Sequence, residues 1–293
     1  MNALFDPRHI RRAFSRAAPG YDAVAVLQRE VGTRLLGSLE YLDDAVPQVV
    51  LDVGSGTGHA AAAMKKRWPK AQVLAMDLAP PMLREAKKQS GWWKPFARVC
   101  ADARALPLAD GSVDLIHSNL CLQWVEDLPA VFAGFRRVLR PGGLLLCSSF
   151  AQDTLVELRE AFAQTDDAPH VSPFATIAQF GDALMAAGFR DPVLDRDVFT
   201  LTYPDMQALM RELRALGATN ALATRRRTLT GRGRFAAAEA AYEPLRTAEG
   251  LLPSSWDVLY AHAWSPDPGA PIREGGHEIA SVPLASIPIR RRT

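Results

Sequence analysis

Three glycines alternate with small polar residues directly after a short, mostly apolar run: Gly54, Gly56 and Gly58. Because a glycine has no Cβ atom, such positions can adopt a positive φ or let a ligand come close to the backbone. The residues before them, 49–53, have the pattern of a buried strand, and the alanine-rich segment 59–67 after them has that of a helix. The free N–H groups at that helix start favour an anionic group. The motif alone fits both a nucleotide site and a plain tight turn.

Aspartates stand near this turn where a nucleoside would need hydrogen-bond acceptors. Asp77 ends the next apolar run, about twenty residues after the glycines, which is typical of a carboxylate that binds ribose hydroxyls. Asp102 follows a third such run, where it could accept a hydrogen bond from an adenine amino group or shape a turn. Asp52 precedes the first glycine, and the G-x-G-x-G spacing differs from the G-x-G-x-x-G of NAD-binding turns. These last two features argue against NAD as the ligand.

The elements that must position these residues alternate along the chain. Strand-like and helix-like patterns follow one another from 48 to 149, which predicts a parallel sheet with helices on both faces. Ligands of such sheets bind beyond the carboxyl ends of the strands. The expected strands are 48–53, 71–77, 96–101, 112–118 and 143–149, and the expected helices are 59–67, 80–89 and 126–139. The candidate residues at the carboxyl ends are Gly54, Ser55, Gly56, Gly58, Asp77, Leu78, Asp102, Ala103, Asn119 and Leu120.

Two helical patterns precede the sheet, and a Pro-Gly pair at 19–20 separates them. Tyr21 follows that break on a segment held by a helix on either side. It is therefore either part of a lid over the ligand or a half-buried packing residue. Asp22 has the residue type of an N-cap and is expected to begin the second helix.

The carboxyl-terminal part of the chain is less regular. Strands are expected at 192–202 and 255–263, with helices before the first of them at 153–163 and 175–187. The segment between these two strands, 204–248, is expected to be helical and is rich in arginine. It forms either a basic rim near the site or an ordinary solvated face.

Composition bounds the function. The chain has 293 residues, 48% of them hydrophobic and 23% charged, which is ordinary for a soluble globular protein. A net charge of +2 argues against nucleic acid as a partner, and the lack of an apolar run near ~18 residues argues against a membrane span. Residues 1–16 lack the apolar core of a secretory signal, and no cysteine or histidine cluster suggests a metal. We therefore expect a cytoplasmic protein, a monomer rather than an oligomer, with a linker-like tail at 266–293.

The glycine turn with Asp52 before it resembles motif I of the class I, Rossmann-like methyltransferases that use S-adenosylmethionine. The run VLRPGGLLL at 138–146 resembles the signature that follows the cofactor motifs in the same class. The resemblance implies an α/β fold with a seven-stranded sheet whose last strand inserts antiparallel. It also implies an N-terminal helical lid (1–40), a methyltransferase domain (41–265) and a helical insertion (204–248) before the last strand.

Further stretches resemble one subfamily, the malonyl-acyl carrier protein O-methyltransferases that open bacterial biotin synthesis. They run nearly from end to end, and those in the carboxyl-terminal half carry the subfamily assignment. The stretches are FSRAAPGYD at 14–22, LQREV at 27–31, LCLQW at 120–124, PHVSPF at 169–174, LRALGATN at 213–220, LTGR at 229–232, YE at 242–243 and WDVLY at 256–260. Two departures are Ser172, where many relatives have Asn, and a longer tail after Ser265; neither touches the expected cofactor site.

This resemblance implies transfer of a methyl group from S-adenosylmethionine to the free carboxylate of a malonyl thioester on acyl carrier protein, with S-adenosylhomocysteine as product. A carboxylic acid with a pKa near ~4 is ionised at pH 7, so no general base is required. Tyr21 is implied as the catalytic residue that closes over the sulfonium and orients the acceptor. The implied cofactor-binding residues are Gln28, Asp52, Gly54, Ser55, Gly56, Gly58, Asp77, Leu78, Met82, Asp102, Ala103, Asn119 and Leu120.

The same resemblance implies individual roles. Asp52 would accept from the cofactor's ammonium group, Asp77 from its ribose, and Asp102 from its adenine. An arginine of the insertion would pair with the malonyl carboxylate or with the phosphate of the carrier's pantetheine arm. The implied substrate- and carrier-binding residues are Arg211, Arg214, Arg225, Arg226, Trp124 and His170. Of these, Trp124 is expected to form part of the wall of the site, and His170 is more simply interpreted as a structural residue.

Three other functions fit parts of the sequence. A class I methyltransferase that acts on a small-molecule nitrogen or carbon would need a base near Tyr21. An arginine-hydroxylating assembly factor of respiratory complex I has a similar fold, but the carboxyl-terminal matches and the lack of a transit-like leader count against it. The intact glycines and Asp77 count against a binding protein with a degenerate pocket. The sequence leaves open whether a carrier protein or a coenzyme A thioester is preferred.

Overall fold

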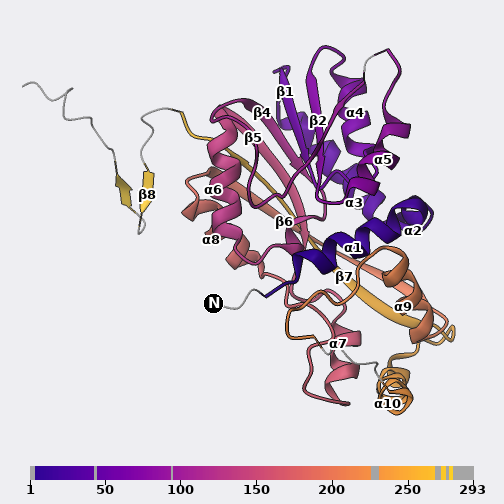
Figure 1. Ribbon diagram of the computed structural model, residues 1–293. Coiled ribbons are helices and arrows are strands. Elements are labelled where there is room, and N and C mark those ends of the chain that lie inside the picture. The colour runs from indigo at the N-terminus through magenta and orange to yellow at the C-terminus, as the bar shows by residue number, and fades with distance from the viewer. Residues whose placement is uncertain are drawn as a thin grey trace, which may run out of the picture.

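The computed structural model of the protein describes residues 4–42, 45–93, 95–225, 231–267, 272–274 and 277–279. Seven strands form one mixed sheet in the order β3-β2-β1-β4-β5-β7-β6, with helices on both of its faces (Figure 1). The first five strands in that order pair in parallel, and β7 is antiparallel to both of its neighbours. The strands are β1 (Val49–Val53), β2 (Gln72–Asp77), β3 (Ala97–Cys100), β4 (Val113–Ser118), β5 (Leu139–Phe150), β6 (Arg190–Tyr203) and β7 (Leu252–Trp264).

Two layers of helices cover the sheet because successive side chains of a strand point to opposite faces. Leu51 and Val53 of β1 pack with helices α6 and α8, whereas Val50 of the same strand packs with α3, α4 and α5. All three of these β1 residues are buried, as expected for a central parallel strand. The covering helices are α3 (Val26–Gly37), α4 (His59–Arg67), α5 (Pro80–Gln89), α6 (Leu128–Val138) and α8 (Ile177–Ala186).

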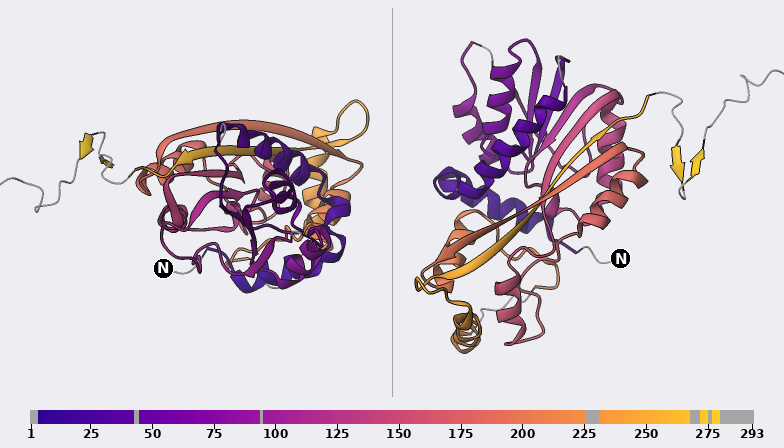
Figure 2. Two further views of the ribbon diagram at one scale, coloured as in Figure 1. Left: turned by 90° about the horizontal axis from the view of Figure 1, so that it is seen from above. Right: turned by 180° about the vertical axis from the view of Figure 1, so that it is seen from behind.

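A smaller helical lobe gathers around the far ends of the long strands β6 and β7 (Figures 1 and 2). Its core combines Tyr242 and Trp256, both nearly without exposure, with leucines of the surrounding helices. Helix α1 (Pro7–Ala17) crosses between this lobe and the carboxyl edge of the sheet, and the short α2 (Tyr21–Val24) follows it. The lobe helices are α7 (Val156–Ala163), α9 (Met206–Ala215) and α10 (Arg232–Tyr242).

The predicted α/β fold is confirmed, including the antiparallel last strand and the helical insertion, since α9 and α10 lie between β6 and β7. One boundary was wrong: β5 begins at Leu139 rather than at 143. Its first residues include Pro141 and two glycines, which favour a turn locally, yet Leu139 pairs with Val113 of β4 before the register shifts. Pairing with the neighbouring strand therefore overrides the local signal.

In the expected tail, the structure describes two short strands that pair with each other, β8 (Ile272–Glu274) and β9 (His277–Ile279). The remainder of the tail, 268–271, 275–276 and 280–293, lies outside the described residues. Among the helices of the described ranges, none combines the length and the apolar character needed to cross a membrane.

Candidate active site

The glycine turn joins β1 to α4, and all three glycines have positive φ, between +53° and +83°. Gly54 and Gly56 line the hollows described below. A Cβ atom on Gly56 would have open space around it, whereas one on Gly58 would lie 2.8 Å from the Cβ of Ala86 in α5. Gly58 lines neither hollow. The lack of a side chain at Gly58 therefore lets α4 pack closely against α5, and its part in cofactor binding stays a prediction.

We expect Gly58→Ala to destabilise the fold by ~2 kcal/mol, because it adds a left-handed backbone conformation to a steric overlap with α5. Gly56→Ala is the matched control, with a similar φ but no neighbour within 4 Å of the new Cβ. It carries the same backbone strain without the overlap, so it should lose less stability than Gly58→Ala, and it should also lose cofactor affinity because Gly56 lines both hollows. Thermal unfolding and calorimetric titration with S-adenosylhomocysteine measure the two effects. Equal stability of the two variants would contradict this assignment.

Asp77 lies at the carboxyl end of β2 and lines a hollow at the carboxyl edge of the sheet. One carboxylate oxygen accepts from the backbone N–H of Gly56 at 2.9 Å and the other from that of Ala79 at 2.7 Å. Burial raises the pKa of Asp77 to about 6, against the opposing effect of these backbone hydrogen bonds. Leu78 and Met82 add apolar surface to the same hollow.

Asp102 lines this hollow as well, but its carboxylate is already engaged. Arg104 donates to it from Nε at 3.0 Å and from Nη2 at 2.6 Å, and these bonds hold the pKa of Asp102 below its ordinary value. Arg104 also lines the hollow, and sequence reasoning missed it. Ala103 lies between the two in the chain and lines the hollow too. Any ligand that meets Asp102 therefore meets an Asp–Arg pair rather than a free carboxylate.

Helix α1 forms a roof over the same hollow. Its residues Ile10 and Phe14 line it together with Phe5 and Trp124, and the rings of Phe14 and Trp124 meet edge to face with 5.5 Å between centroids. The first helical pattern before the sheet predicted this helix, but it did not indicate which surface the apolar face of the helix covers. Apolar residues at helical spacing indicate that one face of a helix is buried, but they do not indicate which surface covers it.

A second hollow adjoins the first on the other side of the glycine turn, and Tyr21, Gly54, Gly56 and Asn119 line both. Asp52 lines this second hollow and is 1% exposed. Its Oδ1 lies 2.8 Å from Nδ1 of the fully buried His117 on β4, whereas its Oδ2 has no hydrogen-bond partner among the described residues. An ammonium group in this hollow would find that oxygen available. Gln28 and Ser55 also line the second hollow.

The lid segment α2 is tied to the glycine turn through Asp22. One carboxylate oxygen of Asp22 accepts from the hydroxyl of Thr57 at 2.6 Å, and the other lies 3.2 Å from Nε2 of His59. The expected N-cap role of Asp22 is wrong, since Ala25 is the N-cap of α3. Burial and the nearby carboxylates raise the pKa of Tyr21 well above its ordinary value, so its phenol stays neutral and can donate a hydrogen bond.

The segment after β4 completes the wall between the hollows. Asn119 donates to the backbone carbonyl of Gln28 at 3.0 Å and accepts from the hydroxyl of Ser148 at 2.8 Å. Leu120 has a φ of +47°, and its N–H donates to the Ser148 carbonyl at 3.1 Å. A non-glycine residue in this strained region indicates that the surrounding contacts fix the backbone there.

A third hollow, distinct from the two above and larger, lies on the lobe side of Trp124, and we call it the second chamber. The side chain of Trp124 also lines the first hollow. Aromatic and aliphatic residues of the lobe helices dominate its walls. Of the predicted substrate-binding residues, Trp124, His170, Arg214 and Arg225 line it. Arg211 does not; it is exposed and lies 3.8 Å from Asp205. Arg226 lies outside the described residues.

His170 and Arg225 are both anchored by neighbours. The ring of His170 stacks on Phe162 with centroids 4.1 Å apart, and its Nε2 lies 2.9 Å from Asp166. Arg225 forms an ion pair with Asp6 at 3.0 Å, and Asp6 is the N-cap of α1. The structural role expected for His170 fits these contacts. Arg225 likewise fastens α1 to the lobe at the edge of the second chamber.

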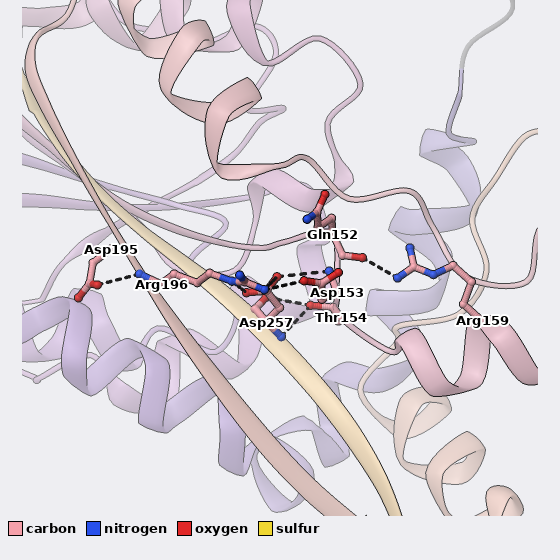
Figure 3. A network of polar contacts seen from close by, with 7 residues as sticks. All are labelled: Gln152, Asp153, Thr154, Arg159, Asp195, Arg196 and Asp257. Atoms are coloured by element: carbon pink, nitrogen blue, oxygen red, sulfur yellow. Dashed lines mark hydrogen bonds and ion pairs between the residues drawn. The ribbon is translucent and has the colours of Figure 1, made fainter. Parts of the chain in front are cut away.

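A polar network holds one wall of the second chamber (Figure 3). Arg196 on β6 binds both carboxylate oxygens of Asp257 on β7, at 2.7 Å and 3.0 Å, and also reaches Asp153 at 2.6 Å. Thr154 exchanges hydrogen bonds with the backbone of Asp257, at 2.8 Å and 3.0 Å. Because Thr154 and the adjoining Leu155 line the chamber, this network fixes the wall to the two long strands.

The sheet order, the glycine turn and a carboxylate at the end of β2 define a class I, Rossmann-like methyltransferase. A model of the methyltransferase domain matches residues 51–147. The chain resembles in structure the YcgJ protein of Bacillus subtilis (TM-score 0.57, 15% identity, 80% of this chain and 100% of that one). It also resembles Haemonchus contortus phosphoethanolamine N-methyltransferase 2 in complex with S-adenosyl-L-methionine (TM-score 0.52, 19% identity, 80% and 53%).

The sequence is 68% identical over 292 residues to the malonyl-[acyl-carrier protein] O-methyltransferase of Xylella fastidiosa, covering 100% of this chain and 99% of that protein. The chain therefore belongs to the malonyl-[acyl-carrier protein] O-methyltransferase family. It is an O-methyltransferase whose cofactor is S-adenosylmethionine.

Proposed function

We propose that the protein transfers a methyl group from S-adenosylmethionine to the free carboxylate of malonyl-acyl carrier protein, and so provides the malonyl methyl ester that begins the pimeloyl chain of biotin. The observation that carries the proposal is the second chamber, which shares the wall residue Trp124 with the hollow that holds Asp77. Methyl transfer requires that the cofactor and the acceptor bind in adjoining sites, so that the methyl group can reach the acceptor. Family membership over the whole length supports the choice of acceptor.

The residues present fit the cofactor. The unpartnered Oδ2 of Asp52 suits an ammonium group, and the Asp77 carboxylate suits a pair of ribose hydroxyls. Leu78 and Met82 would pack against the adenine, and the Asp102–Arg104 pair would meet its edge. The other residues proposed for the methionine side are Gln28, Gly54, Ser55, Gly56, Asn119 and Leu120.

The reaction requires little from the protein beyond the positioning of the two ligands. When bound, the cofactor supplies an electrophilic methyl group on a cationic sulfur. The acceptor carboxylate is ionised near pH 7, so no residue has to remove a proton. The chain's task is to align the two ligands and exclude water, effects that together can contribute roughly 7–11 kcal/mol. Tyr21 lies in the wall of both cofactor hollows, where its neutral hydroxyl would orient the carboxylate.

The second chamber would receive the malonyl group and part of the pantetheine arm. Its apolar walls, which include Phe150, Leu158 and Phe174, would exclude water from the acceptor. Arg214 is exposed at its margin, and no ion pair engages it within the described residues, so it is the arginine we assign to an anionic group of the substrate. We further propose that the protein acts in the cytoplasm as a monomer, with acyl carrier protein as its macromolecular partner and with neither nucleic acid nor membrane.

We expect Tyr21→Phe to lower turnover by about tenfold, the equivalent of one hydrogen bond to the acceptor. The affinity for S-adenosylhomocysteine should stay within about threefold, because the ring that packs in the wall is kept. Tyr41→Phe is the control, since Tyr41 is 50% exposed and its ring packs beside that of His262, away from the site. Steady-state rates at saturating cofactor give the comparison. Unchanged turnover would remove Tyr21 from the reaction.

The activity itself is tested by mass. The protein is incubated with malonyl-acyl carrier protein and S-adenosylmethionine labelled in its methyl group, and the intact carrier is weighed. A gain of one labelled methyl that mild base removes is expected, since base hydrolyses a methyl ester. A carrier of unchanged mass, or a gain that resists base, would overturn the proposal.

A further inference from the structure

Helix α1 has two faces of opposite character. Ile10, Ala13 and Ala17 are buried on its inner face. Its outer face carries only cations: four exposed arginines and no acidic residue among its 11 residues. Three of the arginines are spaced four apart and so lie in one row along the helix. The four are Arg8, Arg11, Arg12 and Arg16.

These arginines have no ion-pair partner within the described parts of the chain. The described arginines of the insertion, which the sequence suggested as a basic rim, mostly form ion pairs with nearby carboxylates. The engaged pairs are Arg211 with Asp205, Arg225 with Asp6, Arg234 with Asp166, and Arg246 with Glu243. Among the described arginines of α1 and of the insertion, the four on α1, Arg214 and Arg232 are therefore the ones without an ion-pair partner.

The position of α1 connects this charge to the reaction. The helix roofs the cofactor hollow through Ile10 and contributes His9 to the second chamber. A further surface hollow lies in the seam between α1 and α9, where Arg16 and Arg214 line opposite sides. Thr219 and Arg214 line both this hollow and the second chamber, so the seam is an approach to the chamber.

We infer that the outer face of α1, with Arg214 across the seam, is the surface on which the acidic carrier protein docks, and that Arg16 and Arg214 receive the phosphate of its pantetheine arm. This inference rests on the proposed function. Two arginines on facing elements present planar donors that suit a phosphodiester. Arginines without partners lose no internal ion pair when an acidic partner binds, so they contribute their full attraction to association.

A second cationic surface offers a rival position. Lys66 and Lys87 are exposed near the ends of α4 and α5, and Trp92 and Trp93 beyond α5 are 90% and 87% exposed. Both helices start at the carboxyl edge of the sheet and end near its amino edge, because each leads into the next parallel strand. A carrier docked there would lie at the opposite edge of the sheet from the chamber. This surface therefore serves as the matched control.

The test compares Arg8→Glu/Arg12→Glu with Lys66→Glu/Lys87→Glu, which change the net charge equally. Rates of methyl transfer are measured with malonyl-acyl carrier protein varied at saturating cofactor. In ~50 mM salt we expect the α1 variant to raise KM for the carrier by about tenfold, with kcat within twofold of the unchanged protein. The difference should shrink in ~300 mM salt because exposed charges are screened. The control variant should keep both constants.

The possible outcomes distinguish a failure of the proposed function from a failure of the docking surface. If the unchanged protein does not methylate the carrier, the proposed function fails. If it does, and the α1 variant keeps its KM, the docking surface is wrong and the proposed function stands. A raised KM for the Lys66/Lys87 variant alone would place the carrier on the rival surface. A fall in kcat together with a lower melting temperature of the α1 variant would show that the substitutions disturb the packing of α1 over the cofactor hollow. The variant Arg16→Gln/Arg214→Gln, which adds no negative charge, is then decisive. If it does not raise KM for the carrier, the inference is rejected.

Discussion

Asp77→Asn should weaken binding of S-adenosylhomocysteine by about a hundredfold. The carboxylate is positioned for ribose and also fixes the glycine turn, since it accepts from the backbone N–H groups of Gly56 and Ala79. An amide in its place loses charge-assisted hydrogen bonds, which contribute about 1.5–3 kcal/mol each, and presents an NH₂ group to donors. Calorimetric titration at pH 8 measures the loss. Asp110→Asn is the control, because Asp110 is exposed and pairs only with Arg137 among the described residues.

The pH dependence of the same binding gives an independent check. Burial raises the pKa of Asp77 to about 6, from an ordinary value of 3.8. The protein therefore has an ionised carboxylate above pH 6 and a protonated one below it, and only the ionised form accepts from both a backbone N–H and a ribose hydroxyl on each oxygen. Affinity for S-adenosylhomocysteine should fall as the pH is lowered from 8 to 5. Asp77→Asn should show little of this fall; an equal slope in both proteins would assign the titration to another group.

Arg196→Met should destabilise the protein by ~3 kcal/mol, the largest stability effect we expect. Asp257 has no exposed surface, and removal of Arg196 would leave its buried carboxylate without a cationic partner. Lys88→Met is the control, since Lys88 pairs with Glu85 at the surface and should change stability by less than ~1 kcal/mol. Denaturant unfolding of both variants measures the difference.

A double variant separates charge from packing at this network. In Arg196→Met/Asp257→Asn the uncompensated charge is gone, so the protein should recover part of the stability that the single change removes. The wall of the second chamber that Thr154 forms should remain looser, and KM for the malonyl carrier should stay raised by about threefold. If the double variant loses more free energy of unfolding than the two single variants together, the interaction between the two residues is not the one described.

The elements of the fold could be read from local patterns. The alternation of strands and helices around the glycine turn, the position of Asp77 at the end of β2 and the insertion between β6 and β7 all match their predicted places within a few residues. These features depend on short-range periodicity and on glycine or proline at turns, and neighbouring residues in the sequence suffice to encode them. Several residues that line the cofactor hollow, among them Gly54, Asp77 and Asp102, follow from the same topology because carboxyl ends of parallel strands meet at one edge, whereas those that α1 contributes do not.

Only the tertiary structure decided which polar groups meet. Asp22 reaches Thr57 across 35 positions, Asp52 reaches His117 across 65, and Arg196 reaches Asp257 across 61. The sequence shows that an arginine or an aspartate is present, but whether it is neutralised, buried or free depends on which element packs beside it. For that reason the sequence directed attention to the arginines of the insertion. Packing pairs most of those that the structure describes, whereas the arginines of α1 have no ion-pair partner among the described residues.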